Sequence, residues 1–147
     1  MKRILVPLDM KTEPDAIARV VADAARGGGA TVRLLHVAPV PECVVDADGR
    51  IVAYASQEGD RLEAEAIDYL RTIEVELDGV PVESVVRFGV PADEIVAEAG
   101  EFGADLVAFA VPSERCLSAL AFCSTVGRVW RHAKAAIMLL RQPALLA

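Results

Sequence analysis

The sequence predicts a single α/β domain in which helices cover both faces of a parallel sheet. Short apolar runs alternate along the chain with longer segments whose apolar residues recur at helical spacing, giving five strands and four helices. The apolar runs lack polar alternation, as in central parallel strands that are buried on both faces. The length of 147 residues fits one domain. We therefore expect one doubly wound layer sandwich over residues 1–147.

The first two strands flank the first helix. The run Ile4–Leu8 is the first strand, and Asp9 stands at its carboxyl end. A capping pattern at Thr12 and a glycine run at 27–29 delimit the helix. Its helical spacing is carried by Ile17, Val20, Val21 and Ala24. Thr31–Val37 is the second strand, and it contains His36.

Residues 38–55 break the regular pattern and form a variable insertion. Two apolar pairs, at 44–45 and 51–52, flank Asp46–Gly49, which predicts a small hairpin or turn. The Asp-x-Asp-Gly order lacks the glycine and glutamate spacing of a calcium-binding loop, so no metal is expected here. The apolar residues need a cover, and we expect them to pack over the second helix or a partner subunit.

The remaining elements continue the alternation. Ser56 is expected to cap the second helix, which runs to Asp78-Gly79, and Val82–Phe88 is the third strand. The third helix begins at Pro91 and stops at Gly103. Leu106–Ala110 and Ala136–Leu140 are the last two strands, separated by a loop at 111–116 and a helix. The apolar positions of that helix are Leu117, Leu120, Ala121, Val129 and Trp130.

Charge and cysteine content exclude several classes of function. The net charge of −7 and the pI near 4.8 oppose binding to nucleic acid or to an anionic membrane. The three cysteines form no C-x-x-C pair, and no signal peptide is evident, so we expect reduced, mostly buried thiols. The apolar run after Met1 ends at Asp9, and no stretch is long enough to cross a membrane. A cytoplasmic protein is expected.

Two stretches resemble the universal stress protein (UspA-like) family. One is Arg-Phe-Gly-x-Pro-Ala-Asp-Glu-Ile at 87–95. The other runs from 103 to 141, with Ala-Asp-Leu before the loop, Ser124 opening the helix body and Arg-His-Ala before the last strand. The resemblance implies a Rossmann-like fold of the adenine nucleotide alpha hydrolase-like kind. It also implies the strand order 3-2-1-4-5.

The resemblance further implies a nucleotide pocket where the strand order reverses. Its adenosine side would be lined by Pro7, Asp9 and Val37. Its phosphate side would be lined by Ala110, Ser113, Cys123, Ser124 and Thr125. ATP-binding members of the family carry glycine at the places of Ala110, Ser113 and Cys123, so this pocket is degenerate. Asp9 has two readings, a ligand for ribose or adenine and a cap of the following turn.

The lost glycines have a direct physical meaning. A phosphate cradle turns several backbone N–H groups toward one anion, which requires residues without a Cβ. A non-glycine residue forced into a left-handed conformation costs roughly 1–2 kcal/mol. Pro112 also lacks an N–H, and Glu114 adds negative charge beside the phosphates. We therefore expect no cofactor, with ATP possible but disfavoured.

No catalytic constellation is visible. His36 lies mid-strand and His132 at a helix end, and both are expected to be structural. We expect a non-enzymatic, cytoplasmic stress-response protein that acts by binding or as a scaffold, without ATP. The alternative is an adenine-nucleotide-binding switch that uses Asp9 and Ser124 in a reshaped pocket, with at most slow hydrolysis.

The expected partners are a second copy of the chain and a protein that the sequence does not identify. The final strand carries Ile137, Met138, Leu139 and Leu140 without a charge or proline, and in the implied order it lies at the edge of the sheet. The resemblance implies dimerisation by antiparallel pairing of this strand. A competing prediction is that the tail at 144–147 folds back and covers it.

Overall fold

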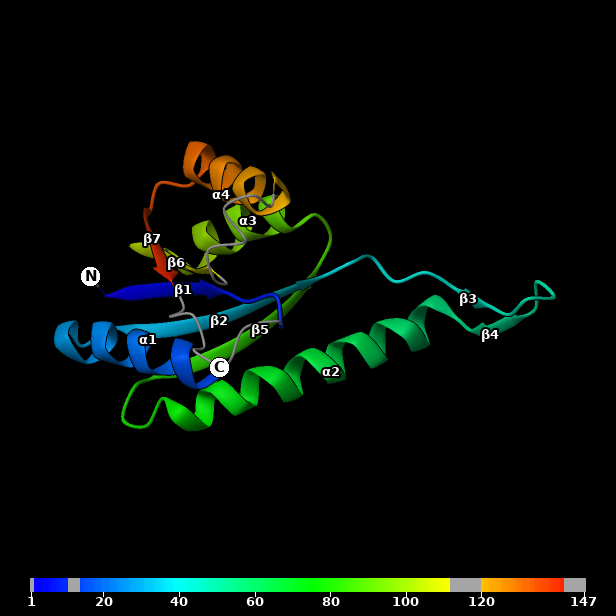
Figure 1. The fold of residues 1–147 in the computed structure, drawn as a ribbon, viewed down its shortest axis with the longest axis horizontal. Coiled ribbons are helices and arrows are strands. Elements are labelled where there is room, and N and C mark those ends of the chain that lie inside the picture. Colours follow the sequence, from blue (N-terminus) through cyan, green and yellow to red (C-terminus); the bar gives the residue numbers. More distant parts are fainter. Residues whose placement is uncertain (1, 11–13, 112–119, 142–147) are drawn as a thin grey trace, which may run out of the picture.

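The computed structural model describes residues 2–10, 14–111 and 120–141 (Figure 1). Five parallel strands form one sheet in the order β5-β2-β1-β6-β7, which is the predicted order 3-2-1-4-5. The strands of this sheet are β1 (Arg3–Pro7), β2 (Thr31–Ala38), β5 (Val82–Phe88), β6 (Leu106–Val111) and β7 (Ala136–Arg141). The helices are α1 (Pro14–Gly28), α2 (Ala55–Glu76), α3 (Pro91–Phe102) and α4 (Leu120–His132).

The helices cover the sheet in two layers, with α1 and α2 on one face and α3 and α4 on the other (Figure 1). A separate apolar core lies on each side. Leu34 belongs to the core under α1 and α2, and its neighbour Leu35 to the core under α3 and α4. Both side chains are completely buried. Alternate side chains of these strands thus enter opposite cores, which confirms the predicted layer sandwich.

Some sequence signals proved less exact than the fold. Helix α1 buries Ala18, Val21, Ala22 and Ala25, while Val20 and Ala24 are exposed. The prediction is therefore confirmed for Val21 and wrong for Val20 and Ala24, while the side chain of Ile17 lies outside the described residues. Trp130 of α4 is 69% exposed, whereas Val129 is fully buried.

The predicted cap of the second helix was also wrong. Helix α2 begins at Ala55 rather than after Ser56, and Tyr54 is the N-cap residue. The backbone N–H of Tyr54 donates to the side-chain Oε1 of Gln57 at 2.9 Å. The Gln57 amide therefore reaches back to the cap, the half of a capping box that a glutamine supplies. The predicted Thr12 capping pattern and Leu117 lie outside the described residues.

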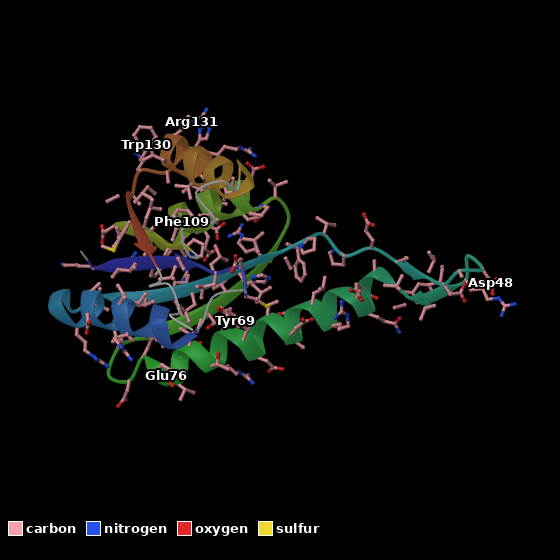
Figure 2. The ribbon with its side chains drawn as sticks, in the orientation of Figure 1. Asp48, Tyr69, Glu76, Phe109, Trp130 and Arg131 are labelled. Atoms are coloured by element: carbon pink, nitrogen blue, oxygen red, sulfur yellow. The ribbon has the colours of Figure 1, made fainter. Side chains whose placement is uncertain are left out.

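The insertion forms the predicted hairpin, β3 (Val44–Val45) with β4 (Ile51–Ala53). Oδ1 of Asp46 accepts the backbone N–H groups of Asp48 and Arg50, each at 2.9 Å, so Asp46 closes the turn. We call residues 39–54 the arm. The arm and the first turns of α2 project beyond the end of the sheet (Figure 1), and Asp48 lies at the far tip (Figure 2).

The apolar residues of the arm do not pack over α2, contrary to the first of the two expected covers. Their exposed fractions range from 41% to 65%, and they are Val40, Val44, Val45, Ile51, Val52 and Tyr54. The reason is geometric, because the hairpin extends past the N-terminal end of α2 instead of lying along it. Cys43 of the arm is also exposed, while Cys116 and the side chain of Cys123 lie outside the described residues, so the expectation of mostly buried thiols stays a prediction.

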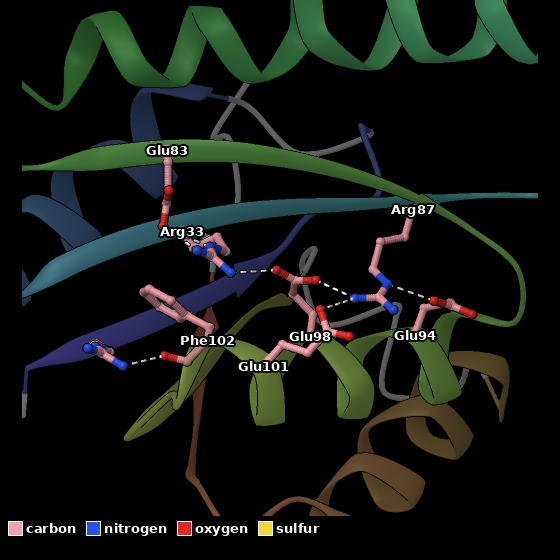
Figure 3. A network of polar contacts seen from close by, with 8 residues as sticks. Arg33, Glu83, Arg87, Glu94, Glu98, Glu101 and Phe102 are labelled. Atoms are coloured by element: carbon pink, nitrogen blue, oxygen red, sulfur yellow. Dashed lines mark hydrogen bonds and ion pairs between the residues drawn. The ribbon is translucent and has the colours of Figure 1, made fainter.

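A buried carboxylate ties α3 to two strands of the sheet (Figure 3). Glu98 is 4% exposed and accepts from Arg33 of β2 at 2.7 Å and from Arg87 of β5 at 2.5 Å. The hydrogen bonds that the Arg87 guanidinium donates to Glu98 and Glu94 raise the pKa of Arg87. The Arg33 guanidinium also stacks on the Phe102 ring, 4.2 Å from its centroid. Arg33 and Arg87 are therefore permanently charged and are surrounded by carboxylates.

Candidate functional site

The site that the sequence points to is the switch point between β1 and β6. Strand β1 pairs with β6 only through Ile4–Leu106 and Leu5–Val107, while its pairing with β2 continues to Pro7 and Leu35. Strand β6 therefore parts from β1 before β1 ends. This happens at the carboxyl ends of the strands, where open parallel sheets bind ligands.

The turn after β1 is held from β2. The backbone N–H of Leu8 donates to the carbonyl oxygen of Leu35 at 2.8 Å, and the carbonyl oxygen of Leu8 lies 2.7 Å from Nδ1 of His36. Because a carbonyl oxygen can only accept, Nδ1 carries the proton and donates. The His36 side chain is buried. The predicted structural role of His36 is confirmed, and that role is to anchor the turn in front of Asp9.

Asp9 and Met10 form the exposed end of this turn. Asp9 is exposed, so its carboxylate lies at the solvent side of the switch point. Met10 has a φ of 70°, the left-handed conformation in which methionine is uncommon. The sequence did not predict the positive φ at this position. The backbone at this position keeps a conformation that suits glycine while the side chain is large.

The first lost glycine position is inside a strand. Ala110 pairs with Leu140 of β7, and the following Val111 pairs with Arg141, so β6 runs one residue further than predicted. The Ala110 side chain is buried in the same apolar core as Leu8. At this position the chain is extended and in register with β7. A phosphate-binding turn has not begun here.

The remaining predicted site residues are described to different extents. Pro7 and Val37 are half-buried at the ends of β1 and β2, and Thr125 is half-buried on α4. Cys123 and Ser124 lie in the first part of α4, but their side chains are outside the described residues, as is all of Ser113. Pro7, Asp9, Val37 and Ala110 thus lie together at the carboxyl end of the sheet.

The described part of the site offers binding groups rather than reactive ones. Asp9 supplies an acceptor for a hydroxyl or an amino group, and Pro7 and Val37 supply apolar walls. Across residues 2–10, 14–111 and 120–141, no group of three or more histidine, cysteine, aspartate or glutamate side chains is placed to hold a metal ion. In the same ranges, no helix combines the length and apolar character needed to cross a membrane.

Comparison with known proteins agrees with this geometry. The sequence model of the Universal stress protein family matches residues 1–141. None of the curated proteins matches the chain. Solved structures match nearly the whole chain. Because their sequence identities are low, they show the fold alone.

Three of these structures are representative. The hypothetical protein MJ0577 is 22% identical with a TM-score of 0.73, over 97% of this chain and 96% of that chain. The universal stress protein UspA from Lactobacillus plantarum is 21% identical with a TM-score of 0.72, over 95% and 97%. The universal stress protein from Archaeoglobus fulgidus in complex with dAMP is 20% identical with a TM-score of 0.61, over 95% and 98%. With the family model spanning all but the last six residues, this chain belongs to the Universal stress protein family.

Proposed function

We propose that this protein is a non-enzymatic binding or scaffold member of the universal stress class that has lost tight ATP binding. The observation that carries the proposal is the state of Ala110. Where ATP-binding relatives have their first motif glycine, this chain has an extended residue paired with β7 and a methyl group buried in the core. An extended residue in register with a neighbouring strand does not form the turn of converging N–H groups that holds an anion.

The neighbouring residues support the same proposal. Pro112 has no N–H to donate, and Glu114 adds a charge of the wrong sign. Met10 occupies a glycine-like conformation with a bulky side chain at the adenosine side. Each change alone is tolerable, but together they weaken the phosphate side of the pocket and crowd its adenosine side.

A second candidate is an adenine-nucleotide switch with at most slow hydrolysis. The early separation of β6 from β1 favours it, because this leaves the switch point available with Asp9 exposed beside it. A relative of the same fold is solved with dAMP, which shows that such a sheet can present an adenine nucleotide site in that protein. In this chain the ribose and adenine would contact Pro7, Asp9 and Val37.

Calorimetric titration with ATP and magnesium separates the two functions. We expect the wild-type protein to bind ATP with a dissociation constant above about 1 mM, which corresponds to a binding free energy weaker than about −4 kcal/mol. Restoring the motif with Ala110→Gly, Ser113→Gly and Cys123→Gly together should tighten binding at least tenfold. Adding Asp9→Ala to this variant should remove the gain if the nucleotide occupies the switch point. Micromolar binding of ATP by the wild type would overturn the proposal in favour of the switch.

A further inference from the structure

We propose that the arm is a self-association surface that packs against the arm of a second copy of this chain. The proposal does not depend on whether the switch point holds a nucleotide. It starts from the distribution of exposed apolar residues. Of the eleven large apolar side chains exposed on the described surface, six lie between residues 40 and 54. The other five are scattered over α1, α2, α4, β7 and the start of α3, and they are Val20, Val75, Val90, Trp130 and Leu139.

The hairpin is apolar on both of its faces. Val44 and Val45 are neighbours in β3 and so point to opposite faces, and both are exposed. Val45 pairs with Ile51 and Val44 pairs with Ala53, with a register shift between the two pairs, and the β4 neighbours Ile51 and Val52 are both exposed as well. A hairpin that served only as a solvated loop would place polar residues on one face. A two-stranded ribbon is also marginally stable in water unless something packs against it.

The area of this surface fits a second copy. The six side chains together expose on the order of 500 Å², which is at the upper end for the largest apolar patch on a monomer. Two arms related by a two-fold axis would bury at most about 1,000 Å² between them, which reaches the lower limit for a specific interface. A two-fold contact uses the same patch twice and needs no other apolar surface. This matters because the other exposed apolar residues are isolated from one another.

The shape of the arm also favours another arm over a flat partner. The hairpin projects beyond the body of the molecule, so both of its faces are accessible (Figure 1). A flat surface could cover one face only, whereas a second projecting arm can reach around the ribbon. A membrane is a poor occupant, because Asp46 and Asp48 lie in the turn at the tip, Glu42 lies at the base, and the chain carries −7 overall.

Sedimentation equilibrium tests the proposal in a variant whose β7 strand is prevented from pairing with a second copy. The variant Leu139→Lys places a charge on that edge at a side chain that is 54% exposed. In this background we expect dimers at about 50 µM protein, with a dissociation constant that the arm controls. Adding Val45→Glu and Val52→Glu should weaken association at least tenfold. Both positions are outside the two cores, so the fold should be retained, which circular dichroism can verify.

The matched control is Val75→Glu in the same Leu139→Lys background. Val75 is even more exposed, at 77%, but it lies near the C-terminal end of α2, far from the arm. This control should leave the dissociation constant unchanged. Two results would overturn the proposal: a Leu139→Lys protein that stays monomeric at about 100 µM, or arm substitutions that weaken association no more than Val75→Glu does.

Salt dependence gives an independent readout. Two copies that each carry −7 repel one another at long range, and the arm contact is apolar. Raising the salt concentration should therefore strengthen the association of the Leu139→Lys protein. Weaker association at high salt would indicate ion pairs as the main contact and would contradict the proposed interface. Binding of the monomer to neutral phosphatidylcholine vesicles through the arm would do the same.

Discussion

Met10 of the candidate site combines a backbone conformation that suits glycine with a large side chain. Its φ of 70° is a conformation in which a residue with a Cβ is strained by roughly 1–2 kcal/mol. Glycine would relieve that strain but would also gain about 0.5–1 kcal/mol of freedom in the unfolded chain. We therefore predict that Met10→Gly is more stable than Met10→Ala by about 0.5–1 kcal/mol in urea unfolding.

The pair of variants isolates the backbone effect, because both remove the same methionine side chain. The control is Ala24→Gly in the exposed face of α1, where the same exchange should destabilise by about 1 kcal/mol. The prediction is thus a reversal of sign between the two positions. If Met10→Gly were the less stable of its pair, the strain assigned to this turn would be absent.

At the same scale, the sequence predicts the role of single residues better than their partners. His36 could be recognised as structural because it interrupts an apolar strand. Its partner is the carbonyl oxygen of Leu8, which is 28 positions away and becomes adjacent only through the register of β1 on β2. Asp9 could be placed at the end of a strand, but the left-handed Met10 after it carries no signal in residue type.

Elements are joined to one another most strongly at Glu98. The carboxylate of this α3 residue is buried between Arg33 of β2 and Arg87 of β5 (Figure 3). Removing it leaves two guanidinium groups without their shared partner in a partly buried place. Loss of one member of a fully buried pair costs about 3–5 kcal/mol, and the 20% and 23% exposure of the arginines reduces this. We predict that Glu98→Ala lowers the free energy of unfolding by about 2–3 kcal/mol.

Glu101→Ala provides the comparison, because Glu101 contacts the same Arg87 at 3.2 Å but is 68% exposed. An exposed ion pair contributes little, so this variant should lose no more than about 0.5 kcal/mol. Chemical denaturation of the two variants measures both values. Equal losses would mean that burial of the Glu98 carboxylate has no energetic consequence.

The existence and order of the elements were predictable from the sequence, and the network between them was not. Apolar runs and helical spacing are local properties, so each strand and helix of the sheet could be located from its own residues. A signal for the network was nevertheless present, since Glu98 lies three residues after the buried Ile95 and so falls on the inward face of α3. A charge on that face needs a partner, but Arg33 and Arg87 become that partner only after the strands pair.

At the scale of the whole molecule, local sequence patterns predict the kind of sheet but not its strand order. Alternating strands and helices imply a parallel sheet, but they are compatible with several strand orders, and the order 3-2-1-4-5 came from the family resemblance. The order places β5 and β7 at the two edges of the sheet. Strand β5 is blunted by charged side chains, among them Glu83 and Arg87. Strand β7 has no charged residue before Arg141, and the tail at 144–147, which was the competing cover for this edge, lies outside the described residues.

We predict that β7 pairs with the β7 of a second copy about a two-fold axis, independently of the arm. Met138 of this strand packs against the core under α1 and α2, so replacing it would also disturb the fold. Leu139 is the better position because it is 54% exposed. In a protein whose arm carries Val45→Glu and Val52→Glu, dimers should persist, and adding Leu139→Lys should weaken them at least tenfold, about 1.4 kcal/mol. The reason is that a two-fold contact brings the introduced lysine close to its own copy.

Val75→Lys is the control and should leave the mass measured by sedimentation unchanged. A monomeric arm variant at micromolar concentration, or a dimer indifferent to Leu139→Lys, would exclude β7 as the interface.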